Sequence, residues 1–376
     1  SLVPNSPMQT GHERVVAFSE AEALAAGLLE LRGFAGDITL LVLEGYYPDD
    51  GYWSRTATPE LRAWAAAGEA AETAALDAPL QDPGLADVRH VVIWADNDEE
   101  DCIAWIQALT AATTGRVTVR IYDAGAADCA MLFRACASAV DELRLMTQTR
   151  HRLSVTLGEM VLLTSLDLSA SRKLVALPDS LGNLTALRRL VLSHCQSLCS
   201  LPDSLGQLTA LTTLDLRACR SLLMLPVTAQ MLTALTWLDL CECAHLATLP
   251  AWVAQRTTWL WLGLPPQTAA LPLWVSQQPS LQVLDVTGCW ALAGVPSTVG
   301  QLATLKVLHL DGGSKLLGLP EVVGQLTALT TLTLSKCVAL TGLPESLGRL
   351  TALTTLDLTQ CKALTTCRCL RISSAR

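Results

Sequence analysis

Acidic residues follow two of the apolar runs in the amino-terminal part of the sequence. Asp96, Asp98 and Asp101 come after one run, and Asp123 comes after the next. Ligands of open α/β sheets gather at the carboxyl ends of the strands, and carboxylate oxygens suit Mg²⁺. These four residues are therefore candidate ligands for a metal ion. The simpler alternative is that they cap the adjacent helices, because Asp accepts backbone N–H bonds at a helix start.

Two pairs of cysteines also have a spacing that metal sites use. Cys241 and Cys243 are separated by one residue, as are Cys367 and Cys369. Neither pair comes with two further ligands, so a zinc site is disfavoured. The phosphate-binding, dinucleotide-binding and hydrolase motifs GxxxxGK[ST], GxGxxG, GxSxG and HExxH do not occur in the sequence. We therefore expect no metal, no cofactor and no enzymatic activity, with the amino-terminal acids as the open question.

The elements that would position the amino-terminal acids alternate along the chain. Apolar runs typical of strands lie at 14–18, 37–45, 90–96 and 116–124, and they are separated by segments typical of helices at 20–32, 60–76, 99–112 and 127–146. This alternation predicts a small α/β domain with a largely parallel sheet over residues 14–150. Residues 1–13 are expected to be disordered. The domain is also expected to cap the part of the chain that begins at residue 151.

From residue 151 onwards the sequence repeats itself. The dipeptide Leu-Pro, once replaced by Val-Pro, recurs at intervals of 24 residues with a single interval of 22. An apolar-x-x-Leu-x-Leu/Val pattern recurs in step with it, beginning at residues 163, 187, 211, 235, 259, 281, 305, 329 and 353. The full unit reads LxxLxLxxCxxLxxLPxxLGxLTA. Such a period indicates a solenoid in which stacked units bury one another's leucines.

This unit resembles the leucine-rich repeat, and its Cys and Leu-Pro positions are similar to those of plant disease-resistance receptors and related intracellular proteins. The resemblance covers residues 153–364. It implies a horseshoe of about nine repeats over residues 151–366, with a parallel sheet on the concave side and short helical turns on the convex side, followed by a tail at 367–376. The fold class is therefore α/β, a leucine-rich repeat solenoid preceded by a small α/β domain.

Composition narrows the partners and the compartment. The net charge is −9 and no cluster of Lys and Arg occurs, so a nucleic acid partner is disfavoured. The sequence shows no apolar run long enough to span a membrane and no secretory signal. Most of the thirteen cysteines recur inside the apolar pattern, as expected for buried, reduced thiols rather than disulfides. These features predict a cytoplasmic protein.

The residues predicted to face away from the leucine core are candidate binding residues. Acids recur at one position of the predicted strands, the residue between the last two apolar positions of the pattern, which we call the aspartate column. One interpretation is an acidic groove for a basic peptide, and the other is a solvated face copied from repeat to repeat. Asp285 beside His309 is a candidate pH-sensitive pair. Paired tryptophans on adjacent strands are candidate anchors, although they also fit a degenerate repeat that fills its own space. The candidate protein-binding residues are Arg189, Asp215, Trp237, Asp239, Trp261, Asp285, His309 and Asp357.

These observations favour a protein or peptide recognition module that binds on the concave face, in immune or signalling sensing as the resemblance implies. The nucleotide-binding module of plant receptors is absent from the sequence. Two alternatives remain open. One is an enzyme whose amino-terminal domain binds a nucleotide or Mg²⁺. The other is a bacterial effector of the leucine-rich-repeat ubiquitin-ligase type, which is disfavoured because no catalytic domain comes after the repeats.

Overall fold

The computed structural model describes residues 13–18, 37–43, 88–94, 117–122, 133–134, 137, 140–146 and 150–364. The chain divides into two compact units between Leu166 and Asp167. The predicted helices at 20–32, 60–76 and 99–112 lie outside the described residues, as do Cys367, Cys369 and the predicted tail. In the described parts of the chain, no helix has both the length and the apolar character that crossing a bilayer requires.

The first unit contains a parallel sheet whose strands follow their order in the sequence. Four strands were predicted and are confirmed, and each pairs in parallel with the next one along the chain. Among the described strands this order never reverses, so they form no topological switch point of the kind at which open α/β sheets bind ligands. The strands are β1 (Glu13–Phe18), β2 (Asp37–Leu43), β3 (Val88–Trp94), β4 (Val117–Tyr122) and β5 (Val140–Met146).

The prediction of a helix over residues 127–146 is wrong for its last seven residues, which form strand β5. Val140, Leu143 and Leu145 are buried there, while Glu142 between them is exposed. Their spacing is that of the repeat strands, apolar-x-x-Leu-x-Leu, and the alternation of buried and exposed residues has the period of a strand. The helical composition of the segment concealed this motif.

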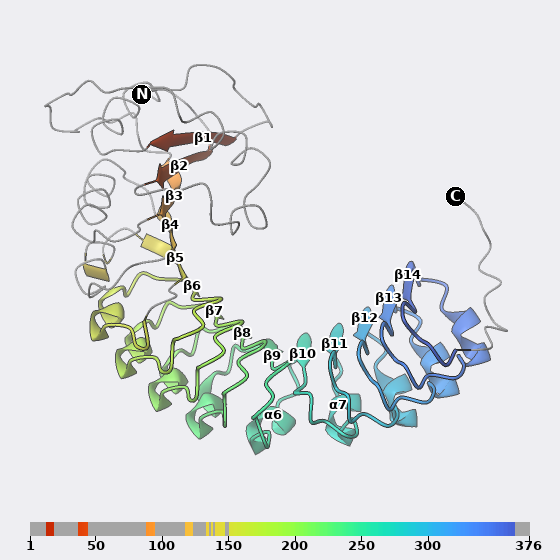
Figure 1. Ribbon diagram of the computed structural model, residues 1–376. Coiled ribbons are helices and arrows are strands. Elements are labelled where there is room, and N and C mark those ends of the chain that lie inside the picture. Colours follow the sequence, from red (N-terminus) through yellow and green to blue (C-terminus); the bar gives the residue numbers. More distant parts are fainter. Residues whose placement is uncertain are drawn as a thin grey trace, which may run out of the picture. The chain divides into compact units, whose positions relative to one another are not determined.

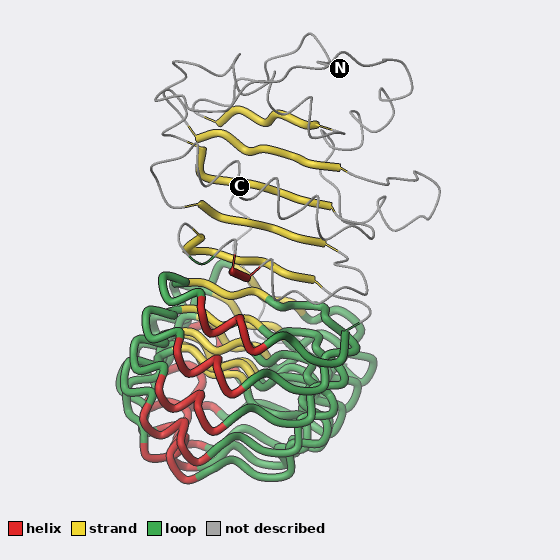
Figure 2. Tube along the Cα trace, turned by 90° about the vertical axis from the view of Figure 1, so that its left-hand side faces the viewer, coloured by secondary structure: helices red, strands yellow, loops and turns green. Residues whose placement is uncertain are grey.

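The second unit is a solenoid of short parallel strands. Figure 1 shows the strands on the inner side of its arc and the helical turns on the outer side, and Figure 2 shows the turns stacked in one column. Its strands are β7 (Arg189–Val191), β8 (Thr213–Asp215), β9 (Trp237–Asp239), β10 (Trp261–Gly263), β11 (Val283–Asp285), β12 (Val307–His309), β13 (Thr331–Thr333) and β14 (Thr355–Asp357), and β6 (Ser165–Asp167) lies at the boundary between the units.

The helical turns of the second unit begin directly after the proline of each recurrent Leu-Pro or Val-Pro pair. Proline suits this place because it fixes φ near −65° and needs no N–H partner. The 3-10 helices are η3 (Asp179–Asn183), η4 (Asp203–Gln207), η5 (Val227–Met231), η6 (Ser297–Gln301), η7 (Glu321–Gln325) and η8 (Glu345–Arg349), the α-helices are α6 (Ala251–Gln255) and α7 (Leu273–Ser276), and η2 (Val155–Glu159) lies in the first unit.

Leucines form the core between the strands and the turns. The middle residue of each strand from β7 to β13 is fully buried, as the repeat pattern predicts. Leu214 and Leu332, for example, have no exposed surface. Because each three-residue strand alternates its side chains, the first and third residues are left on the opposite face. The core therefore determines which residues a partner can reach.

The recurrent cysteines bond to the backbone of the preceding repeat. Sγ of Cys195 lies 3.2 Å from the carbonyl oxygen of Leu168, and Sγ of Cys219 lies 3.1 Å from that of Leu192. The same contact recurs at Cys243, Cys289, Cys337 and Cys361. Burial raises the pKa of Cys195 to about 12 and that of Cys337 to about 11. These thiols stay protonated and structural, as predicted.

A left-handed turn follows the strands, and the short repeat interrupts it. The turn residue has φ near 60° at Ala170, His194, Ala218, Glu242, Lys336 and Gln360, and Gly288 and Gly312 occupy the same place. In the 22-residue repeat this place holds Pro266, whose ring excludes positive φ. The short repeat therefore follows a different path after its strand.

Aromatic side chains fill the core beside the short repeat, and a partly exposed arginine covers them. Trp259 takes the place of an inward leucine and is fully buried, and its Nε1 donates to the carbonyl of Val253 at 3.0 Å. Arg256 stands where six other repeats have a buried leucine and the following repeat has Gln278. Its guanidinium lies 5.4 Å from the ring centroid of Trp259 and 5.7 Å from that of Trp252. The interpretation that bulky residues fill a degenerate repeat thus holds for Trp259 and Trp252.

Candidate functional site

The candidate site is the strand face of the second unit, which we define by three rows of residues. The first row contains the first residue of each strand from β7 to β14, and the third row contains the third residue. The entry row contains the residue just before each strand. Most side chains of the first and entry rows are exposed or partly exposed, because the intervening leucines take up the core.

Two tryptophans stack in the middle of the first row. Trp237 on β9 is paired in register with Trp261 on β10, and their ring centroids are 4.3 Å apart at an interplanar angle of 24°. Both rings are partly exposed, unlike the buried Trp259. The row continues with Val283 and Val307, and Leu260 in the entry row is 40% exposed. We call Trp237, Leu260, Trp261, Val283 and Val307 the apolar strip.

The aspartates of the third row end the strands. Oδ1 of Asp215 accepts a hydrogen bond from the backbone N–H of Arg217 at 2.9 Å, two residues later. The same bond recurs at 2.8 Å at Asp239, Asp285 and Asp357, and at 2.9 Å at Asp167. A short acidic side chain that bonds its own backbone two residues on is a common turn device. This local role explains why Asp recurs in the third row, and no partner is needed to explain it.

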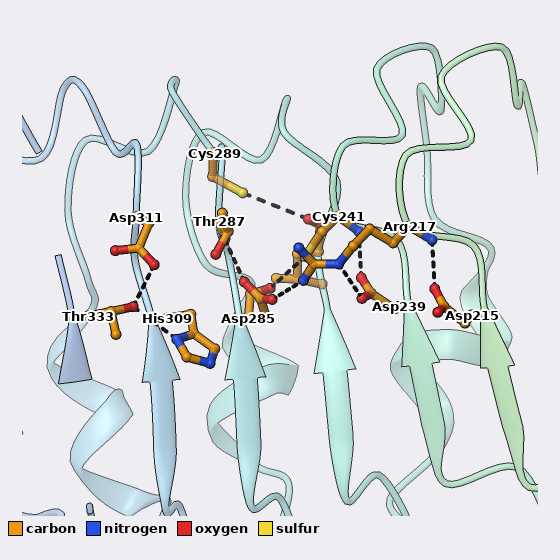
Figure 3. Close-up of polar contacts among 11 residues, drawn as sticks. Asp215, Arg217, Asp239, Cys241, Asp285, Thr287, Cys289, His309, Asp311 and Thr333 are labelled. Atoms are coloured by element: carbon orange, nitrogen blue, oxygen red, sulfur yellow. Dashed lines mark hydrogen bonds and ion pairs between the residues drawn. The ribbon is translucent and has the colours of Figure 1, made fainter. Parts of the chain in front are cut away.

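Arg217 bridges two of these aspartates (Figure 3). Its Nε donates to Oδ2 of Asp239 at 2.9 Å, and its Nη2 donates to Oδ2 of Asp285, two strands further on. Both carboxylates are almost wholly buried, whereas the Arg217 side chain is 30% exposed. Two of the aspartates that were predicted to form an acidic groove are therefore buried and bonded to a cation within the chain.

Glycine on the intervening strand makes the bridge possible. Gly263 stands in the third row between Asp239 and Asp285. A Cβ atom at this position would overlap the carboxylate of Asp239 and lie 2.9 Å from Sγ of Cys241. Any larger residue would force these side chains apart, so the short repeat supplies the gap that Arg217 spans.

Burial outweighs pairing in its effect on Asp239. Loss of solvent raises the pKa of its carboxyl group to about 6, although the charge of Arg217 acts in the opposite direction. Burial also raises the pKa of Asp215 above its ordinary value. For Arg217, burial acts to lower the pKa, but the neighbouring Asp239 and Asp285 overcome it and the pKa is raised.

Cys241 completes a group whose atoms are close enough to hold a metal ion. Within the described parts of the chain, Asp239, Cys241 and Asp285 form such a group, with one ligand atom from each lying within 4.8 Å of the others. Burial raises the pKa of the Cys241 thiol well above its ordinary value, which disfavours the thiolate that metals bind. Arg217 already donates to both carboxylates of the group. Cys243 faces the carbonyl of Leu216 instead.

His309 bonds away from Asp285. Its Nδ1 lies 2.9 Å from Oγ1 of Thr333, which donates to Oδ2 of Asp311 at 2.6 Å (Figure 3). Because the hydroxyl proton goes to Asp311, Nδ1 must be the donor to Thr333. These hydrogen bonds from His309 through Thr333 to Asp311 take the place of the expected interaction of His309 with Asp285. Asp311 contacts the hydroxyl rather than the imidazole, so the group lacks the nucleophile, base and orienter order of hydrolases.

Three exposed cations also lie on this face, and only one of them was predicted. Arg188 in the entry row and Arg189 in the first row are exposed, as is Lys306 in the entry row. Asp357 is partly exposed on β14. Sequence reasoning missed Arg188, Arg217, Leu260 and Lys306 because it considered only the first and third rows. The entry row has the same period and would have shown all but Arg217.

The amino-terminal candidates stay predictions. Asp96, Asp98, Asp101 and Asp123 lie outside the described residues. The described residues therefore do not test this hypothesis.

Comparisons with known proteins find similarity in solved structures alone. No protein family model matches the chain, and no curated protein matches it. A leucine-rich-repeat protein of Leptospira interrogans is 20% identical, with a TM-score of 0.46, over 76% of this chain and 86% of its own. The leucine-rich-repeat domain of the type III effector XopL is 28% identical, with a TM-score of 0.49, over 61% of this chain and 81% of its own. The strand ladder and the leucine layers of the second unit are those of a leucine-rich-repeat solenoid.

Proposed function

We propose that this protein is a recognition module that binds a protein or peptide partner on the strand face, with the apolar strip as the anchoring surface. The observation that carries the proposal is the partly exposed stack of Trp237 and Trp261 in the middle of that face. The core needs neither ring, because the inward positions of both strands are filled by buried leucines, Leu238 and Leu262. Within this proposal the partner belongs to a signalling or immune sensing system, as the resemblance to disease-resistance repeats implies.

Physical chemistry supports tryptophan as the anchor rather than aspartate. Large aromatic side chains contribute most of the binding free energy at many interfaces, since they bury much apolar area at little entropic cost. Asp239 and Asp285 are buried and bonded to Arg217, so they offer little to a partner. Binding through the face is therefore expected to depend on the apolar strip.

The test is selection of a random peptide library on the purified, immobilised full chain. We expect the wild-type protein to enrich a family of peptides and the double variant Trp237→Ser, Trp261→Ser to enrich none of them. For individual peptides, the loss of both rings should weaken binding by at least 10-fold, which corresponds to about 1.4 kcal/mol. Fluorescence anisotropy with labelled peptides measures the change.

Trp290→Ser is the matched control. Trp290 is 54% exposed and lies in a turn outside the strand face, where Lys315 Nζ lies 5.7 Å from the centroid of its ring. This variant loses an exposed indole of the same kind, so its binding should equal that of the wild type. Equal enrichment by the double variant, with its fold verified by circular dichroism, would show that the strand face is not the binding surface.

A further inference from the structure

The charged residues of the first and entry rows are all positive. In the first and entry rows, across the described repeats from β7 to β14, the charged residues are Arg188, Arg189 and Lys306. All three side chains are exposed. Neither row contains an acid in any of these repeats. The apolar strip on β9 to β12 thus lies between cations, with Arg188 and Arg189 two strands before it at β7 and Lys306 at its β12 end.

The acids of the same face that lie nearest the apolar strip are bonded within the chain. Asp239 and Asp285 are buried against Arg217, and Asp311 accepts hydrogen bonds from the Thr333 hydroxyl and the Ser335 N–H. Oδ1 of Asp215 accepts the Arg217 N–H. They stand in or beyond the third row, which is separated from the first row by two residues, or about 7 Å along the strand. A segment lying on the apolar strip meets the exposed cations before it meets these carboxylates.

We infer that the partner presents an apolar or aromatic segment flanked by acidic residues, rather than the basic segment that the aspartate column had predicted. This inference rests on the proposed function and specifies the chemistry of the partner. Charge complementarity across an interface selects the partner and its register, and like charges are penalised. Arg188 and Arg189 pair with carboxylates at one end of the segment, and Lys306 pairs with one at the other end.

The spacing of the strands sets the length of the segment. Neighbouring strands lie about 4.8 Å apart, so the distance from β7 to β12 is about 24 Å. An extended peptide that crosses the strands covers this distance with about seven residues. The apolar strip accounts for about four of them. The expected pattern is therefore one or two acids, a short spacer, an apolar core of about four residues and a further acid.

The peptide selection on the full chain also tests this inference when its products are sorted by charge. Among peptides whose enrichment requires Trp237 and Trp261, Asp and Glu should exceed Lys and Arg beside the apolar core. Replacing the flanking acids of such a peptide by Gln should weaken binding about 3- to 10-fold, and replacing them by Lys should weaken it further. Raising the salt concentration should reduce these differences.

Charge reversal in the protein provides the complementary measurement. The triple variant Arg188→Glu, Arg189→Glu, Lys306→Glu should reverse the preference and select peptides with basic flanks. The matched control is Lys336→Glu, which reverses an exposed lysine in a turn outside the rows and should leave the preference unchanged. Circular dichroism and thermal melting check that each variant is folded.

The outcomes separate the two proposals. Enrichment that depends on the tryptophans but shows basic or neutral flanks would overturn the inference and leave the binding surface intact. An unchanged preference in the triple variant would overturn it as well. If no peptide is enriched in a way that depends on the tryptophans, the proposed function itself is refuted.

Discussion

At the scale of single residues, the repeated aspartate has different environments at equivalent positions. Asp239 is 2% exposed and bonded to Arg217. Asp357 has the same place in its strand but is partly exposed. Burial raises the pKa of Asp239 to about 6, while hydrogen bonds from the backbone and side chain of Thr359 lower the pKa of Asp357 below its ordinary value. Equivalent sequence positions therefore respond to pH in opposite directions.

This difference predicts how Asp239→Asn changes the pH dependence of stability. A carboxyl group whose pKa is higher in the folded state binds its proton more tightly there, so the free energy of unfolding falls as pH rises from about 4 to about 6. Asn removes this contribution and still accepts the Cys241 N–H. We expect the fall between pH 4 and pH 6.5 to be smaller in the variant by on the order of 1 to 3 kcal/mol. Urea denaturation across this range measures it.

Asp357→Asn is the control, because folding lowers the pKa of Asp357 whereas it raises that of Asp239. Its folded pKa is lowered, so the wild-type side chain stabilises the protein above its unfolded pKa and loses that effect as pH falls through the folded pKa. The asparagine variant should therefore lose stability relative to wild type at neutral pH. Identical pH profiles for wild type and Asp239→Asn would contradict the assignment of the raised pKa to Asp239.

At the scale of elements, the left-handed turn after each strand is the most regular feature of the array. Lys336 occupies this turn with φ of 62°, where Gly288 and Gly312 adopt the same conformation without a side-chain penalty. The backbone N–H of Lys336 donates to the Thr359 carbonyl at 2.8 Å, a bond that glycine preserves. Left-handed φ costs non-glycine residues about 1 kcal/mol or more.

Lys336→Gly is accordingly expected to stabilise the protein. We predict a gain of about 0.5 kcal/mol, because relief of the left-handed penalty exceeds the extra entropy that glycine brings to the unfolded chain. Lys306→Gly is the matched control, since Lys306 is also exposed but has no positive φ, and it should lose about 0.5 to 1 kcal/mol. Urea midpoints that shift in the same direction for both variants would disprove the turn argument.

At the scale of the whole molecule, the second unit is a row of layers in which each repeat rests on its neighbours. Interior layers are covered on both sides, and Leu214 has no exposed surface. Leu356 holds the equivalent place in β14, the last described strand, and is partly exposed. Because the stability of a solenoid is a sum over neighbouring interfaces, identical leucines are expected to contribute unequally.

This predicts unequal costs for the same substitution. Leu214→Ala should destabilise the protein by about 2 to 5 kcal/mol, as truncation of a fully buried leucine does. Leu356→Ala should cost less than half as much, since the wild-type side chain is not fully removed from water and the site can collapse. Chemical denaturation, monitored by circular dichroism, measures the loss of stability in each of the two variants. Equal losses would mean that the last described layer is covered as well as the interior ones.

The periodic part of the protein could be predicted from the sequence alone. The 24-residue pattern placed the leucines in the core, the cysteines against the backbone and the tryptophans on neighbouring strands, because each of these places depends only on local alternation and on stacking of identical units. Strand β5 was missed because its short apolar motif lies within a segment of helical composition.

How side chains meet across strands depended on the tertiary structure. Arg217 reaches Asp285, 68 residues later, because Gly263 leaves a gap on the strand between them. His309 bonds to Thr333 rather than to Asp285 because a neighbouring hydroxyl offers an acceptor. These choices depend on the reach of side chains and on which neighbour removes a buried charge from water, quantities that no spacing in the sequence encodes. They changed the expected charge of the surface that a partner meets from negative to positive.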